Sequence, residues 1–190
     1  LAVVKILVTR GEVAELGLPP SEQPTIILYA RPYTPPSETE YQQGWTVVSF
    51  PEPRTNFLSR YKSLNYLFCL VARQYALDRG AQEALILEPD GLVTEGAATA
   101  ILWQENGQLF RAAAGSLLPS VTLAVLGQAL APEGVVIRSA PVTISRLQQA
   151  EAVWLANSLM GLMPVASLDG KSFPVSPRTA FLQERLWSRS

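Results

Sequence analysis

Two charged residues stand in apolar surroundings and are the first candidates for chemistry. Glu95 lies within DGLVTEGAATAILW, residues 90–103, a stretch of mostly small and apolar residues that predicts two β-strands. A carboxylate in such a place is unfavourable unless a nearby group requires its negative charge. Lys62 is one of three lysines in the chain and lies between SRY and a long apolar segment. The two side chains could hold opposite ends of one aromatic aldehyde, with the amine at its carbonyl carbon and the acid at a ring nitrogen.

Both residues also have ordinary interpretations. Lys62 can be a solvated residue at a helix N-terminus, although the helix dipole disfavours a cation there. Glu95 can be an outward side chain on an edge strand. The functional alternative joins them, because pyridoxal phosphate forms a Schiff base with a lysine and needs a carboxylate beside its protonated pyridine nitrogen.

Two hydroxyl-containing turns could bind the phosphate of such a cofactor. In PSVTLAVL, residues 119–126, a loop enters a predicted helix, so the backbone N–H groups of Val121 and Thr122 and the Thr122 hydroxyl lie at its positive end. In ANSLMG, residues 156–161, Asn157 and Ser158 follow a predicted buried strand. Serine and threonine often cap helices, so capping is the ordinary interpretation of these hydroxyls.

The composition excludes several kinds of site. The 190 residues include no histidine, which excludes Ser-His-Asp and Cys-His catalysis and His-ligated metal sites, and we expect no metal. The single cysteine, Cys69, excludes an intramolecular disulfide and is expected to be a buried small hydrophobe. With 15 Lys and Arg against 16 Asp and Glu, no basic excess favours nucleic acid, and no apolar run is long enough for a membrane span. The free thiol and the lack of a leader favour the cytoplasm.

The apolar pattern predicts a mixed α+β protein. Strands are expected at residues 2–11, 24–33, 44–50, 83–89, 92–96, 99–104, 108–113, 135–142, 151–158 and 162–175, the last segment forming a hairpin around Asp169-Gly170. Helices are expected at residues 63–80, after Ser120, at 143–150 and from Ser176 onward. The helix at 63–80 is apolar nearly all round in its first half, so we expect it to be buried. A proline-rich polar segment, RPYTPPSETEY, predicts a linker.

The block YKSLNYLFCLVARQYALDRGAQEALILEPDGLVTEGAATAILW, followed by PSVT and ANSLMGLMPV, resembles the class IV aminotransferase family, the fold type IV enzymes that use pyridoxal 5′-phosphate. Four features occur in one order: a lysine, a glutamate, a Val-Thr turn and an Asn-Ser turn. This combination arises by chance much less often than any one of the four. The resemblance implies two domains. Residues 1–33 would be the remaining part of an apparently truncated small N-terminal domain, 34–41 the linker, and 42–190 the large cofactor-binding domain.

The resemblance also implies roles for particular residues. It makes Lys62 the catalytic Schiff-base lysine, which also moves the proton, and Glu95 the acid beside the pyridine nitrogen. The other implied cofactor contacts are Tyr66 near the ring oxygen, Leu118 on the ring face, Val121 and Thr122 at the phosphate, Ser158 as a second hydroxyl, and Asn157, with Leu159 on the substrate side.

Within the family, ANSLMGLMPV is most similar to 4-amino-4-deoxychorismate lyase. That similarity implies a small-molecule substrate, 4-amino-4-deoxychorismate, from which pyruvate is released to leave 4-aminobenzoate for folate biosynthesis. The alternatives are an aminotransferase of branched-chain or D-amino acids, and a non-catalytic relative that keeps the fold. The family also implies a homodimer.

Departures from the family pattern bear on these alternatives. Ser120 and Leu123 stand where relatives have a glycine before the Val-Thr turn and an arginine after it, and we expect an altered phosphate turn because serine lacks the backbone freedom of glycine. AELGL replaces an arginine-glycine-tyrosine step, so the arginine for a substrate carboxylate is either absent or replaced, with Arg31 and Arg54 as the candidate substitutes. These departures favour the non-catalytic relative, whereas the retained lysine and glutamate favour an enzyme.

Overall fold

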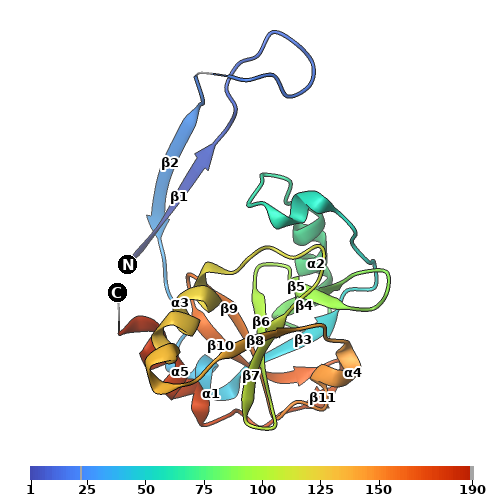
Figure 1. The fold of residues 1–190 in the computed structure, drawn as a ribbon, viewed down its shortest axis with the longest axis vertical. Coiled ribbons are helices and arrows are strands. Elements are labelled where there is room, and N and C mark those ends of the chain that lie inside the picture. The colour runs from blue at the N-terminus through green and yellow to red at the C-terminus, as the bar shows by residue number, and fades with distance from the viewer. Residues whose placement is uncertain (22, 189–190) are drawn as a thin grey trace. The chain divides into compact units, whose positions relative to one another are not determined.

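The chain forms two compact units in the structure, a computed structural model that describes residues 1–21 and 23–188. The first unit is Leu1–Pro35 and the second begins at Pro36. The mixture of helices and strands confirms the predicted α+β class (Figure 1).

The segment predicted as a linker, residues 34–41, is helical in its second half. Residues 38–43 form helix α1 (Glu38–Gln43), which begins with a capping box. The Tyr41 hydroxyl donates a 2.5 Å hydrogen bond to the Met160 carbonyl, and this bond ties α1 to the rest of the second unit.

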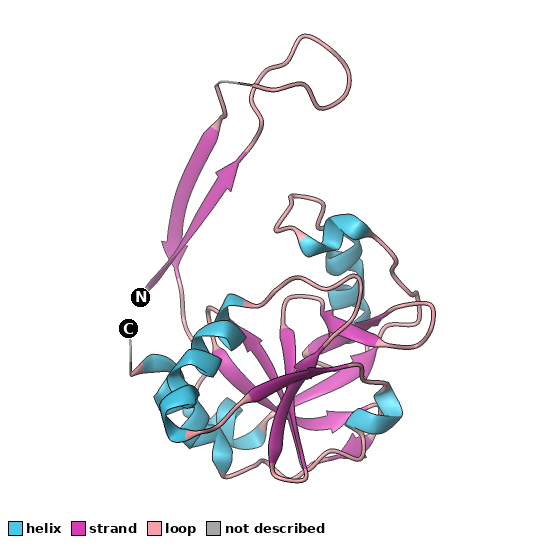
Figure 2. Ribbon diagram, viewed as in Figure 1, coloured by secondary structure: helices cyan, strands magenta, loops and turns pink. Residues whose placement is uncertain are grey.

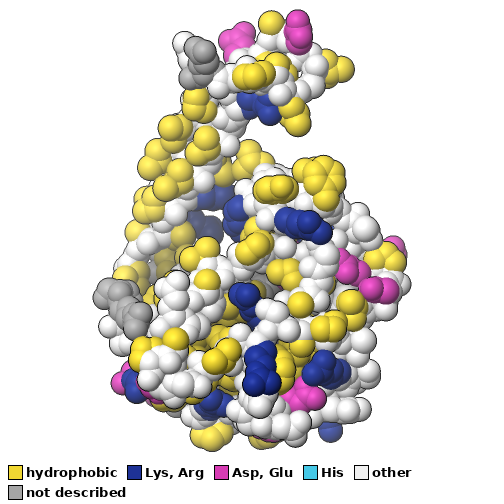
Figure 3. Space-filling model, in the orientation of Figure 1, with side chains coloured by type: hydrophobic (Ala, Val, Ile, Leu, Met, Phe, Trp, Pro, Cys, Tyr) yellow, Lys and Arg dark blue, Asp and Glu magenta, His cyan; other side chains and the backbone are white. Residues whose placement is uncertain are grey.

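The first unit is a β-hairpin. Its strands β1 (Ala2–Val8) and β2 (Ile26–Pro32) pair antiparallel along their whole length. Alternating β-branched and aliphatic residues favour the extended backbone, yet neither strand has a buried side chain. Hydrophobic side chains are visible along this hairpin in Figure 3, in keeping with the exposure of Val4, Ile6 and Leu28.

One curled sheet forms the centre of the second unit (Figure 2). Its strands are β3 (Trp45–Ser49), β4 (Glu83–Leu87), β5 (Val93–Gly96), β6 (Ala100–Glu105), β7 (Gln108–Ala112), β8 (Ile137–Ala140), β9 (Ala152–Asn157), β10 (Gly161–Leu168) and β11 (Lys171–Ser172). They follow the order β5-β4-β3-β10-β9-β6-β7-β8, with β11 beside β10. Neighbouring hairpin strands are antiparallel, whereas β3 runs parallel to β4 and β10, and β7 runs parallel to β8.

Helices cover this sheet on its outer faces. The described helices of the unit besides α1 are α2 (Leu67–Leu77), α3 (Val121–Leu130), α4 (Ile144–Leu147), α5 (Arg178–Trp187) and the 3₁₀ helices η1 (Phe57–Arg60) and η2 (Ala131–Glu133). Helices α3 and α5 share a hydrophobic cluster with β6 and β9. That cluster contains Trp154, whose indole N–H donates a 2.8 Å hydrogen bond to the Thr179 hydroxyl. Among the described residues, no helix is long and apolar enough to cross a membrane.

Helix α2 differs from the prediction in its start and in its burial. It begins at Leu67 rather than near Ser63, because the Ser63 hydroxyl accepts the Asn65 N–H in a local turn that competes with helical hydrogen bonding. Its buried residues are Ala72 and Ala76, which pack on β4. The predicted burial of the whole helix is therefore wrong, because one face packs inward, with Phe68 and Tyr75 partly buried beside the two alanines, while the opposite face is exposed.

The other helix starts agree more closely with the sequence. Ser120 caps α3, since its hydroxyl accepts the Leu123 N–H at 3.2 Å. Thr143 caps α4 in the same way. In α5 the Ser176 hydroxyl accepts the Arg178 N–H, but the helix itself begins at Arg178, one residue later than predicted.

Candidate active site

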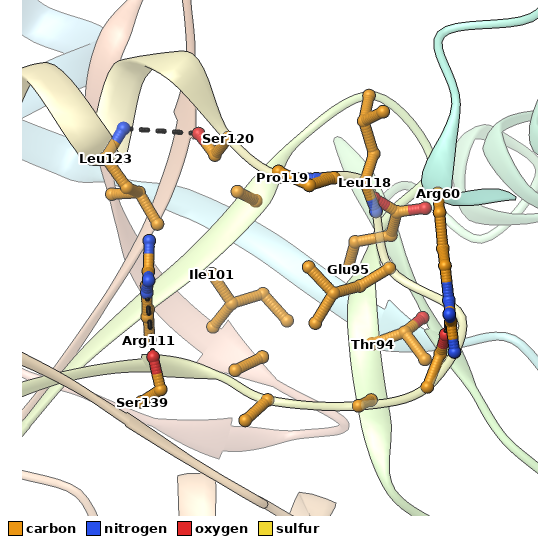
Figure 4. Close-up of a pocket in the computed structure, with 16 residues that line it drawn as sticks. Arg60, Thr94, Glu95, Ile101, Arg111, Leu118, Pro119, Ser120, Leu123 and Ser139 are labelled. Carbon is orange, nitrogen blue, oxygen red and sulfur yellow. Dashed lines mark hydrogen bonds between the residues drawn. The ribbon is translucent and has the colours of Figure 1, made fainter.

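The two edges of the curled sheet, β5 and β8, approach each other and close only part of the way. Leu92 forms an isolated antiparallel bridge with Thr143, and the Val93 N–H donates a 2.8 Å hydrogen bond to the Val142 carbonyl. Next to these contacts lies a cavity of about 290 Å³ (Figure 4). It is lined by residues of β5 to β8, by the loop at residues 113–120, by the start of α3 and by Arg60 of η1. The open seam of the sheet thus gives the end of β5 a partly enclosed environment.

Glu95 forms part of the wall of this cavity, and both of its carboxylate oxygens are engaged. Oε1 lies 2.5 Å from the Arg54 guanidinium, and Oε2 accepts the Leu118 N–H at 3.1 Å. The side chain is 13 % exposed. Burial raises the pKa of Glu95, while Arg54, the Leu118 N–H and the charge of Lys62 act to lower that pKa. The ordinary interpretation, an outward side chain on an edge strand, is therefore wrong.

Lys62 lies in the irregular segment between η1 and α2. Its side chain is exposed, and Nζ lies 5.0 Å from the centre of the Tyr66 ring. Tyr66 is half-buried and stands at the N-terminal boundary of α2. The lysine charge lowers the pKa of Glu95, so the amine and the buried acid interact electrostatically although 33 positions separate 62 from 95 in the sequence.

The N-terminus of α3 carries Val121 and Thr122 as its first two helical residues. The N–H groups of a first helical turn lack intrahelical acceptors, so this end of the helix can bind an anion. Val121 is exposed and Thr122 is buried. The backbone of Ser120 has φ −77° and ψ 116°, an ordinary extended conformation that needs no glycine.

Asn157, Ser158 and Leu159 occupy the turn between β9 and β10. The Asn157 side-chain oxygen accepts the N–H groups of Leu159 and Met160, each at 3.0 Å, and its amide nitrogen donates to the Ala98 carbonyl at 3.4 Å. Asn157 therefore shapes the turn rather than projecting freely from it. Ser158 and Leu159 are exposed on the turn.

The predicted residues thus fall into three groups. Glu95 and Leu118 are in direct contact and line the cavity, and the turn at residues 121–122 follows directly in the chain. Lys62 and Tyr66 form a second group, in which the charge of Lys62 acts to lower the pKa of Glu95. The turn at residues 157–159 is joined to the backbone three residues after Glu95, but neither it nor the lysine segment contributes to the described wall of the cavity.

Comparison with known proteins identifies the family. The model of the family described as amino-transferase class IV matches residues 1–168. A protein from Methanocaldococcus jannaschii named "Putative branched-chain-amino-acid aminotransferase" is 31 % identical over 173 residues, which is 90 % of this chain and 60 % of that protein. The chain belongs to the class IV aminotransferase family.

Solved structures of class IV relatives have the same fold. A structure described as "Putative 4-amino-4-deoxychorismate lyase" from Legionella pneumophila has a TM-score of 0.89 and 26 % identity, and covers 98 % of this chain and 69 % of its own. The PLP-bound form of a "hypothetical aminotransferase" from Mycobacterium tuberculosis has a TM-score of 0.83 and 18 % identity, with 97 % and 66 % covered. These likenesses confirm the fold type IV architecture. This chain spans about 60 % of the length of the archaeal relative.

Class IV aminotransferases use pyridoxal 5′-phosphate, and the side chains found here are of the kinds that this cofactor needs. Lys62 supplies an accessible primary amine. Glu95 supplies a buried carboxylate, and a protonated ring nitrogen would compensate its burial better than solvent can. The start of α3 supplies N–H groups for a phosphate. The donor set therefore fits the cofactor of the family.

Arg54, one of the two arginines considered as substitutes for a substrate-carboxylate group, is bonded inside this class IV chain instead. Its NH2 donates to Glu95 and to the Ser116 carbonyl at 3.1 Å, and its NH1 lies 3.5 Å from the Cys69 sulfur. The guanidinium is 11 % exposed, so it is not available for a substrate carboxylate. Cys69 is half-buried rather than buried. The signal that could have found the ion pair is the glutamate itself, because a buried acid requires a nearby cation.

Proposed function

We propose that this chain is the cofactor-binding part of a pyridoxal-5′-phosphate lyase, which releases pyruvate from 4-amino-4-deoxychorismate to give 4-aminobenzoate. The observation that carries the cofactor assignment is the buried Glu95 carboxylate. It accepts a hydrogen bond from the Leu118 N–H, and the charge of Lys62 acts to lower its pKa. The chain that carries it belongs to the class IV family. A surface-exposed pair of the same residue types would support no such assignment.

The residues of this chain would hold the cofactor at three points. The Lys62 amine would bind its aldehyde carbon, and a Glu95 oxygen would accept a hydrogen bond from the N–H of its protonated ring nitrogen. The N–H groups of Val121 and Thr122, the Thr122 hydroxyl and Ser158 would bind its phosphate, while Leu118 would pack on the ring. Tyr66 would approach the ring oxygen from the side of Lys62. Asn157 contributes indirectly, because its side chain holds the turn that carries Ser158 and Leu159.

Each of these groups has a separate part in the chemistry. When bound, pyridoxal phosphate supplies an electron sink for the bonding electrons of the substrate carbon. Lys62 Nζ takes the proton from that carbon and holds it for return. Glu95 stays ionised and keeps the ring nitrogen protonated, since a carboxylate near a cation favours the charged form of both. Leu159, exposed beside Ser158, borders the substrate.

Two observations favour the lyase. The sequence ANSLMGLMPV resembles the corresponding turn of 4-amino-4-deoxychorismate lyase, and the Legionella structure of that description has a TM-score of 0.89 and 26 % identity. The second candidate is a branched-chain aminotransferase, which is favoured by the 31 % identity of the archaeal relative. Both candidates use the same cofactor site, so they differ in substrate contacts only.

A pair of assays distinguishes these candidates. With pyridoxal phosphate present, we expect 4-amino-4-deoxychorismate to yield 4-aminobenzoate, and a branched-chain amino acid with 2-oxoglutarate to yield no glutamate. Lys62→Ala should lower the rate about 10²- to 10⁴-fold, the usual contribution of a positioned acid–base group. Lys171→Ala is the control, because that exposed lysine lies on β11. Glutamate formation without 4-aminobenzoate would favour the aminotransferase, and no turnover of either substrate would favour a non-catalytic relative.

We also propose that the protein is a homodimer. The outer face of α2 and the segment before it carry exposed apolar side chains, at Leu64, Leu67, Leu70 and Val71. Such a contiguous apolar face is typical of a surface that another protein covers. The unpaired thiol of Cys69 favours the cytoplasm as the compartment, because disulfide-free cysteines are usual in reducing surroundings.

A further inference from the structure

Arg54 is the most extensively bonded buried cation near the candidate site. Its backbone N–H donates to the Leu87 carbonyl at 2.8 Å, which fixes the segment after β3 beside the end of β4. Its guanidinium lies 5.6 Å from the centre of the Phe68 ring, on α2. The Nε atom is buried and has no hydrogen-bond partner among the described residues. The remaining donors are directed at Glu95, at Ser116 and at Cys69.

One nitrogen of this guanidinium connects two parts of the site. NH2 donates both to Glu95 Oε1 and to the Ser116 carbonyl, and the same carbonyl also accepts the Ser59 hydroxyl at 2.7 Å. Two residues further on, the Leu118 N–H donates to Glu95 Oε2. The ion pair therefore holds the loop at two points, through Arg54 at Ser116 and through Glu95 at Leu118. The loop is also held independently of this pair, by Ser59 at Ser116 and by Arg60, whose Nε donates to the Gly115 carbonyl at 2.6 Å.

This loop leads directly to the end of the site that would bind phosphate. Only Pro119 and Ser120 separate Leu118 from the first residue of α3. A shift of the loop at Ser116 or Leu118 would move the side chain proposed to pack on the cofactor ring. It would also move the N–H groups proposed to bind the phosphate. The two ends of the proposed site are thus linked through one ion pair.

The same ion pair controls the charge of the acid. Burial favours the protonated, neutral form of Glu95, and the bond to Arg54 opposes this effect. Without the arginine, the carboxyl group would hold a proton over a wider pH range. A protonated carboxyl group offers a protonated ring nitrogen a weaker, uncharged partner.

We propose that Arg54 is a positioning residue, which holds the Glu95 carboxylate and the loop at residues 115–118 in one arrangement and so sets both ends of the cofactor site. This inference rests on the proposed function. It adds a residue that acts on the cofactor through Glu95 and Leu118, and it predicts that the two ends of the site respond together to one substitution.

The first test measures the Kd of pyridoxal phosphate for the 190-residue chain by quenching of tryptophan fluorescence. Arg54→Met should raise this Kd about 10- to 100-fold, as does removal of the groups that orient the ligands of a bound metal. Arg54→Lys should recover part of the affinity, because lysine keeps the charge but cannot reach two acceptors in a fixed fork. The matched control is Arg146→Met, since Arg146 also pairs with a glutamate and lies 5.7 Å from an aromatic ring, that of Trp103. The Kd of pyridoxal phosphate for Arg146→Met should equal that for the unsubstituted chain.

A double-mutant cycle shows whether Arg54 acts through Glu95. Arg54→Met and Glu95→Gln are measured singly and together. If the arginine acts through the acid, the combined loss of affinity is smaller than the sum of the two single losses. Additive losses would overturn the inference, as would an Arg54→Met variant that keeps the Kd of the unsubstituted chain. If Arg54→Met does not fold by circular dichroism, the cycle is run with Arg54→Lys.

A measurement without cofactor separates this inference from the proposed function. In the chain free of pyridoxal phosphate, the unfolding free energy of Arg54→Met should fall more steeply with rising pH, because the folded state without this cation holds the Glu95 proton more tightly. Adding Glu95→Gln to Arg54→Met should remove that change. A chain that shows this linkage and does not bind pyridoxal phosphate would overturn the proposed function, and the positioning role with it. A chain that binds the cofactor and lacks the linkage would overturn the positioning role alone.

Discussion

Glu83 and Glu95 are both buried carboxylates, but they are stabilised in different ways. Glu83 is fully buried, and its oxygens accept hydrogen bonds from the N–H groups of Ala84 and Ala98 and from the Thr99 hydroxyl. Its charged neighbour is Arg73, at 3.5 Å. Glu83 therefore holds the turn that follows Glu95, whereas Glu95 itself is turned toward the candidate site.

The stability of the protein should depend on pH through Glu83. Burial raises the pKa of Glu83, against the lowering effect of Arg73 and the three hydrogen bonds. The folded state therefore keeps a proton that the unfolded chain releases, so the unfolding free energy falls as pH rises from the ordinary glutamate pKa through the raised pKa. Glu83→Gln should reduce this fall, by at most about 1.4 kcal/mol per pH unit, the slope for one proton.

Urea unfolding at a series of pH values measures this slope. The loss of one acceptor oxygen should also lower the stability of Glu83→Gln by about 1–3 kcal/mol at the acidic end of the series. Glu52→Gln, at an exposed position, is the control and should leave the slope unchanged. An unchanged slope in Glu83→Gln would show that Glu83 titrates alike in the folded and unfolded chain.

Single residues of the site were predictable when their type was unusual for their surroundings. Glu95 in a small and apolar stretch indicated a buried acid, and the structure shows one. Arg54 could not be assigned in the same way, because it meets Glu95 across 41 positions of sequence and is brought there by the pairing of β3 with β4 and of β4 with β5. A pattern in the sequence predicts that a buried acid has a cation beside it, but not which one.

At the level of elements, α2 shows where an apolar pattern misleads. Leu67 and Leu70 are 71 % and 62 % exposed, although the sequence predicts a buried helix. An apolar pattern predicts that a helix face packs against another surface. It does not predict whether that surface belongs to the same chain or to another one. The strands were predictable because each is bounded by turn residues, such as Asn106 and Gly107, both with positive φ, between β6 and β7.

The exposed face of α2 gives a direct test of the proposed homodimer. Leu67→Glu combined with Leu70→Glu should convert the dimer to a monomer, because two charges would be buried unpaired in an apolar interface. Sedimentation velocity of the purified chain measures the change. Val136→Glu, at another exposed apolar position before β8, should leave the dimer intact. A chain that is already monomeric at micromolar concentrations, or a double variant that stays dimeric, would contradict this assignment of the interface.

At the level of the whole molecule, the sequence predicted the class of fold and the order of elements, but not the connections of the sheet. Residues 45–49 read as an ordinary strand, and nothing in their pattern shows that β3 stands between β4 and β10 and parallel to both. That arrangement curls the sheet and brings the edges β5 and β8 together, and the cavity beside Glu95 follows from it. Resemblance to the family supplied this architecture, since periodicity alone cannot pair distant strands.

The most direct test of the account asks which lysine meets the cofactor. The purified chain is incubated with pyridoxal phosphate, reduced with borohydride, digested and mapped by mass spectrometry. The account predicts a label on Lys62, little on Lys5 or Lys171, and a weaker Lys62 label in Glu95→Ala at the same cofactor concentration. Lys5 on β1 and Lys171 on β11 are exposed lysines and serve as internal controls. Equal labelling of all three lysines, or a Lys62 label as strong in Glu95→Ala as in the unsubstituted chain, would contradict the claim that these two side chains bind one molecule between them.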